Sequence, residues 1–129
     1  MALWWTGKAD VAAGDHESAH LRLGEALRAF QAFEMNARVL DCLEDHAGLF
    51  RSEGRADDAA RLYASIEHFR ERLALRLPPR NAKRWSDAVA AARAELGDAA
   101  FDAAWSEGRM WQLEQATRRA LAPADKVAA

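Results

Sequence analysis

The stretch GRADDAARLY at residues 54–63 decides the fold, because it repeats a pattern that first occurs 40 positions earlier, in GDHESAHLRL at residues 14–23. In each copy a glycine is followed by an acidic residue and then by an alanine at matching offsets, as Gly54, Asp57 and Ala59 show. Glycine ends one helix, an acidic residue favours the positive start of the next, and a small alanine permits helices to cross closely. The repeat therefore predicts two helix–turn–helix units.

Apolar residues follow both turns at helical spacing. The stripe after the first turn is Ala19, Leu23, Ala26, Leu27 and Phe30, and the stripe after the second is Ala59, Leu62, Ile66, Phe69 and Leu73. The helix that precedes Gly54 has its own stripe of Val39, Leu43, Ala47 and Phe50. Strong helix formers dominate, and only three prolines occur. An all-α class is predicted.

Composition limits the classes of function and the cellular compartment that fit this chain. The chain has 129 residues and a formal net charge of -2, a balance that argues against a dedicated nucleic-acid binder. Cys42 is the only cysteine, so an intrachain disulfide is excluded and a reducing compartment fits best. The sequence has neither an apolar run long enough to span a membrane nor a signal peptide. We therefore expect a cytoplasmic protein without a membrane partner.

The repeat decays beyond Leu77-Pro78-Pro79-Arg80. Helices are predicted over residues 81–96, 98–107 and 113–121, the first two closed by Gly97 and Gly108. The predicted organisation is two helix pairs over residues 1–76, a C-terminal helical cap of the same domain over 77–121, and a tail over 122–129.

The pattern resembles the tetratricopeptide repeat. The resemblance is carried by small residues seven positions before each turn glycine, Gly7 and Ala47, and by alanines five positions after it, Ala19 and Ala59. It implies antiparallel helix pairs in a right-handed superhelix. The 40-residue period implies helices longer than the family standard, and the abrupt start within a first helix leads us to expect a fragment of a longer protein.

Residues 42–121 are similar to the C-terminal helical region of large bacterial LuxR-type regulators and related predicted signalling ATPases. The residues that carry this likeness are Gly54-Arg55, Ala59-Ala60-Arg61-Leu62, Leu77-Pro78-Pro79, Ala90 to Gly97, Phe101, Ala104-Trp105, Glu107-Gly108-Arg109, Leu113-Glu114 and Ala116. The resemblance implies a sensing or interaction platform. The chain has no phosphate-binding Gly-x-x-x-x-Gly-Lys-Ser/Thr loop and no convincing DNA-reading helix–turn–helix, so neither ATP hydrolysis nor direct nucleic-acid binding is assigned to it. Gln112 replaces the family's Ser or Thr at the start of the last helix, which weakens that helix cap.

The tetratricopeptide resemblance also implies a partner-binding groove, lined by the first helix of each pair. The matching positions are Trp4, Lys8, Val11, Asp41, Glu44, Gly48 and Arg51. This mixture of aromatic, basic and acidic groups predicts a protein or peptide partner. Adjacent residues lie about 100° apart on a helix, so Trp4 and Trp5 cannot both face one core. They predict an exposed edge for self-association.

Other interpretations stay open. The same architecture would permit a small-molecule effector site. His16 and His20 have the spacing of two ligands of a small metal-dependent hydrolase, but a third ligand is missing, and a solvated helix face is the plainer reading. His46 and His68 are expected to be partly buried, Cys42 a core residue, and Trp85 and Trp105 parts of the cap core. The acidic residues of Asp57-Asp58 are expected at a solvated helix start. No catalytic residue, metal or cofactor is assigned.

Overall fold

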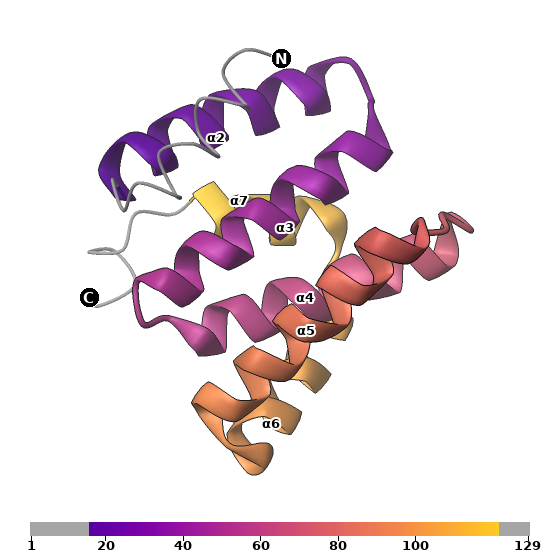
Figure 1. The fold of residues 1–129 in the computed structure, drawn as a ribbon. Coiled ribbons are helices and arrows are strands. Elements are labelled where there is room, and N and C mark those ends of the chain that lie inside the picture. Colours follow the sequence, from indigo (N-terminus) through magenta and orange to yellow (C-terminus); the bar gives the residue numbers. More distant parts are fainter. Residues whose placement is uncertain (1–15, 122–129) are drawn as a thin grey trace.

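A computed structural model describes residues 16–121. Within that range the chain forms six helices and no strand, which confirms the all-α class (Figure 1). The helices are α2 (His16–Ala32), α3 (Asn36–Ser52), α4 (Ala56–Arg72), α5 (Pro79–Leu96), α6 (Asp98–Arg109) and α7 (Leu113–Leu121). The predicted turn near Gly14, the small residue Gly7 and the tail over residues 122–129 lie outside the described residues.

Each 40-residue repeat consists of two units of equal length, and each unit is one helix with the turn that follows it. Helices α2, α3 and α4 each have 17 residues and are joined by three-residue turns, so they begin at intervals of 20. Glu34, Gly54 and Ala74 follow the three helices and have positive φ angles of 54°, 78° and 55°. After each of them the next amide donates to a carbonyl of the preceding helix's last turn, at 2.8–2.9 Å. The predicted turn at Gly54 is confirmed, and the same turn recurs where no glycine is present.

Consecutive helices among α2, α3 and α4 run antiparallel (Figure 1). They pack against each other, and most residues of the predicted stripes are buried. Ala19 and Ala59 are fully buried, as expected for residues at helix crossings. The stripes of α2 and α3 are also buried. In α4 the prediction was wrong for Leu73, which is 44% exposed because the helix ends one residue before it.

Helix α6 packs extensively against α4 through a close approach at Gly108. The prediction that Gly108 closes the helix was wrong, because α6 continues through Arg109. Gly108 is buried, and a Cβ there would overlap the backbone carbonyl of Arg61. The glycine therefore permits two helix backbones to approach one another instead of ending a helix.

Helix α7 returns across the first helices, behind α3 in Figure 1. It packs against α2, α3 and α4 through Ala116, Thr117 and Ala120, which are buried. A Cβ at Gly24 of α2 would lie 3.2 Å from Leu121. The boundary predicted at residue 76 falls in the loop between α4 and α5.

Asp58 links α7 to the start of α4. Its carboxylate pairs with Arg55 and Arg61 at 3.0 and 3.3 Å, and with Arg119 of α7 at 3.4 Å. Asp58 is only 6% exposed, so its predicted place on a solvated face was wrong. The three arginines explain how the carboxylate is accommodated away from water.

Candidate binding groove

Two of the predicted groove residues, Asp41 and Glu44, are brought together by an arginine from the next helix. Arg70 of α4 has a side chain that is only 8% exposed, and its Nη2 donates to Asp41 Oδ1 at 3.2 Å and to Glu44 Oε1 at 2.9 Å. The two carboxylates are therefore held in fixed positions by a nearly buried cation. The predicted groove residues Trp4, Lys8 and Val11, and the predicted edge of Trp4 and Trp5, lie outside the described residues.

Arg51 does not belong to this cluster. It lies near the opposite end of α3, where its Nη2 donates to Glu95 Oε1 of α5 at 3.1 Å. Burial alone would lower the pKa of Arg51, but hydrogen bonds with Glu95 and Tyr63 outweigh it and raise that pKa. Arg51 therefore connects α3 to α5. The predicted groove residue Gly48 has no atom within 4 Å of a Cβ placed on it.

Helix α5 forms the opposite wall, which sequence reasoning did not include. A cavity of about 210 Å³ is lined on one side by Asp41, Glu44 and other residues of α3, and on the other by Leu77, Asn81 and Arg84. Arg70, which holds Asp41 and Glu44, has its guanidinium carbon 4.9 Å from the centroid of the Trp85 ring of α5. We call this space between α3 and α5 the groove.

One sequence signal could have indicated the groove. Arg70 follows Ile66 by four positions and therefore continues the buried face of α4 with a charge. A nearly buried arginine requires acidic partners, and Asp41 and Glu44 lie next to the apolar stripe of α3. Trp85 was expected in the cap core, and it is partly buried there, with its ring edge-on to Tyr63 at 5.2 Å.

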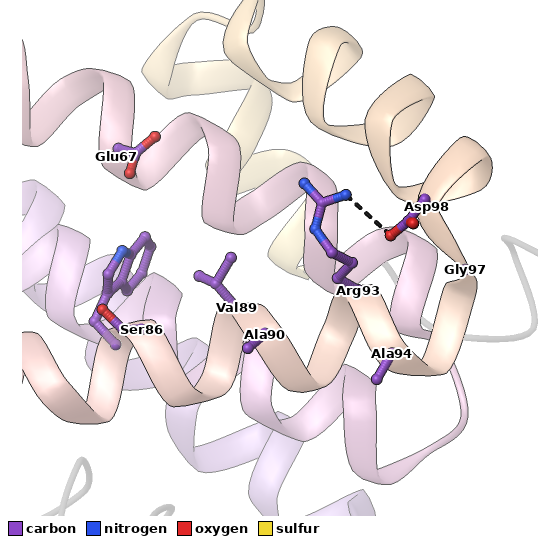
Figure 2. A pocket seen from close by; sticks show the side chains of 9 residues that line it. Glu67, Ser86, Val89, Ala90, Arg93, Ala94, Gly97 and Asp98 are labelled. Carbon is purple, nitrogen blue, oxygen red and sulfur yellow. Dashed lines mark hydrogen bonds and ion pairs between the residues drawn. The ribbon is translucent and has the colours of Figure 1, made fainter.

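A second, larger cavity of about 630 Å³ lies between α4, α5 and the start of α6 (Figure 2). Trp85, Val89 and Ala90 supply apolar lining, while Glu67 and the ion pair of Arg93 with Asp98, at 3.2 Å, supply charge. Burial raises the pKa of Glu67, Glu71 raises it further, and Arg109 opposes both. The cavity could hold a ligand with an apolar body and polar ends.

The histidines are divided among different partners. His16 Nε2 lies 3.2 Å from Ser52 Oγ, and His20 Nε2 lies 2.8 Å from Glu53 Oε1. In residues 16–121 there is no group of three His, Cys, Asp or Glu side chains that could hold a metal ion.

His46 and Cys42 lie in the core. His46 is fully buried rather than partly buried as predicted, and neither ring nitrogen has a hydrogen-bond partner. Burial, with a smaller contribution from His20, lowers its pKa to about 4. Cys42 is buried as predicted, and its thiol donates to the Leu23 carbonyl at 3.5 Å.

Over the described residues, none of the helices is both long and apolar enough to cross a membrane. A scan against protein-family models, a search of curated proteins and a search of solved structures each found no match to the chain.

Proposed function

We propose that the chain is a non-catalytic interaction and sensing module of a cytoplasmic bacterial regulator of the LuxR type or a related signalling ATPase. Its groove binds a segment of a partner protein. The observation that carries this proposal is the Arg70 cluster, in which a nearly buried cation joins α3, α4 and the indole of α5. The resemblance of residues 42–121 to such regulators supplies the biological context.

The cluster favours recognition because its charges are already positioned. Asp41 and Glu44 have side chains that are 37% and 25% exposed, so the carboxylates held by Arg70 remain accessible from the groove. Preorganised polar groups beside an apolar wall bind a peptide without first losing much side-chain entropy. A groove between two helices also offers the length that an extended or helical segment requires.

The test is a peptide-display selection against the whole chain, followed by binding measurements on two variants. Asn81→Trp places a large ring in the groove, whereas Asp87→Trp places the same ring on an exposed part of α5 outside it. Selected peptides should bind Asn81→Trp at least about tenfold more weakly and should bind the control as they bind the parent. Peptides that bind all three proteins equally would contradict a site in the groove.

A small-molecule effector site is a second candidate, favoured by the larger cavity in Figure 2. A thermal-shift panel of nucleotides, amino acids and sugars would identify a ligand. Val89→Trp would fill that cavity and abolish the shift, while leaving peptide binding in the groove unchanged. A stabilising ligand whose effect survives Val89→Trp would rule out this cavity as its site.

A further inference from the structure

The loop between α4 and α5, together with the first turns of α5, is strongly basic. Residues 72–84, which we call the basic edge, contain five basic residues and no acidic one, although the whole chain has a net charge of -2. Eleven of these thirteen residues are exposed. Charge is therefore concentrated in a segment that borders the groove.

The arginines of the basic edge are not neutralised within the described chain. Arg72, Arg76, Arg80 and Arg84 form no ion pair with any residue between 16 and 121, and only Lys83 pairs, with Asp87 at 3.0 Å. Arginines that remain exposed and unpaired favour an anionic ligand.

The neighbouring carboxylates, in contrast, already have partners. Asp41 and Glu44 are paired with Arg70, while Glu67 and Glu71 are paired with Arg109 at 3.3 and 3.1 Å. The charge left for a ligand to neutralise is therefore positive.

Apolar surface accompanies these charges. Leu73 and Leu75 are 44% and 37% exposed. A cavity of about 430 Å³ at Leu75 is lined by apolar side chains and by four charged ones, Glu67, Arg70, Glu71 and Arg76; the apolar lining residues are Leu75, Leu77, Ala82 and Trp85. An apolar side chain could enter this cavity while its neighbours in sequence remain close to the arginines.

We propose that the partner segment is acidic and carries a large apolar residue, which enters this cavity while its carboxylates pair with Arg76, Arg80 and Arg84. The proposal rests on the proposed function, because it names the chemistry of the protein partner. A nucleic acid or an anionic membrane would also meet the arginines. A peptide fits better because it can place one large apolar side chain in the cavity and its carboxylates at individual arginines beside it.

Fluorescence anisotropy of the whole chain tests the proposal. The probe is a labelled peptide in which glutamates alternate with leucines, compared with a lysine–leucine version, an all-glutamate version, a single-stranded oligonucleotide and phosphatidylserine vesicles. The Arg76→Gln/Arg80→Gln variant removes two charges from the edge. The Arg28→Gln/Arg118→Gln variant removes two exposed charges from α2 and α7 and is the matched control.

We expect the glutamate–leucine peptide to bind more tightly than every other probe, and its affinity to fall as salt is raised. The edge variant should bind it about fivefold to tenfold more weakly, and the control within about twofold of the parent. Equal losses in both variants, or tighter binding of the oligonucleotide or the vesicles, would overturn the proposal. Self-association of the parent that the edge variant abolishes would assign the edge to a second copy instead. If display-selected peptides bind Asn81→Trp more weakly but bind the edge variant as they bind the parent, the partner segment is not acidic. The proposal that the groove binds a partner would then still stand.

Discussion

Gly108 shows how a residue without a side chain allows one helix to pack closely against another. Its carbonyl accepts a hydrogen bond from Ser65 Oγ at 2.7 Å, and its Cα faces the backbone of Arg61. The ion pair of Arg61 with Glu107, at 2.8 Å, lies beside this contact. A glycine inside a helix is normally unfavourable, so its presence here reflects packing rather than local conformation.

Gly108→Ala should lower the free energy of unfolding by roughly 1–3 kcal/mol, because the new methyl group cannot fit without moving α6 away from α4. Gly48→Ala is the matched control. A Cβ there meets nothing within 4 Å, so its higher helix propensity should stabilise by about 0.5–1 kcal/mol. Urea unfolding followed by circular dichroism measures both, and equal stability of the two variants would contradict the close approach.

His46 predicts a pH dependence of stability. Its pKa is lowered from 6.5 to about 4, chiefly by burial, with the positive charges of His20 and Arg28 as smaller causes and the Leu23 carbonyl opposing them. The unfolded chain therefore takes up a proton at higher pH than the folded chain does. Stability is lost as pH falls from about 6.5 towards 4, by on the order of 3 kcal/mol.

His46→Leu should remove this loss, so its urea midpoint should vary less between pH 7 and pH 4 than that of the parent. It also removes two buried nitrogens without partners, so stability at pH 7 should not decrease. His68→Gln changes a half-buried histidine elsewhere and should leave the parent's pH profile unchanged. If the urea midpoint of His46→Leu still falls steeply between pH 7 and pH 4, groups other than His46 cause the pH dependence.

At the scale of the elements, the three equivalent turns allow a reciprocal experiment. Gly54 and Ala74 have similar positive φ angles, but only glycine adopts that conformation without a steric cost. No atom lies within 4 Å of a Cβ at Gly54, so a substitution there changes backbone conformation without adding a clash.

Gly54→Ala should therefore destabilise the protein by about 1 kcal/mol, and Ala74→Gly should stabilise it by a smaller amount, because glycine also increases the entropy of the unfolded chain. Thermal unfolding of both variants and of the Glu34→Gly variant measures these effects. Destabilisation by Ala74→Gly as large as that by Gly54→Ala would show that the two turns are not equivalent.

For the molecule as a whole, the alternative from a different functional class is a metal-dependent hydrolase built around His16 and His20. Their Nε2 atoms lie next to separate partners, Ser52 at the end of α3 and Glu53 just after it. Two ligands at helical spacing are fewer than a zinc site requires.

We expect the purified chain to contain no stoichiometric zinc, and its melting temperature to be unchanged by a chelator. Elemental analysis and thermal unfolding with and without EDTA measure this, and a chain loaded with magnesium, which should also melt like the parent, is the control. One zinc ion per chain that is lost in His16→Ala would contradict the non-catalytic proposal.

By itself the sequence determined the helical class, the 40-residue period, the turn at Gly54 and most of the buried stripes. These features follow from interactions between residues close together in the chain, such as the alanine five positions after a turn glycine or apolar residues at helical spacing. Asp41 and Glu44 were named as groove positions only through the tetratricopeptide resemblance, and their role in binding stays a prediction.

Only the tertiary structure decided which separate elements meet. It placed Arg70 between Asp41 and Glu44, brought α5 opposite α3, returned α7 to Gly24 of α2, and made Gly108 a point of contact rather than a helix end. Each of these contacts joins residues more than 25 positions apart, and no local pattern specifies such a pair. The physical reason is that helix propensity and amphipathicity select elements and their buried faces, whereas the fit of side chains across a crossing selects the partner.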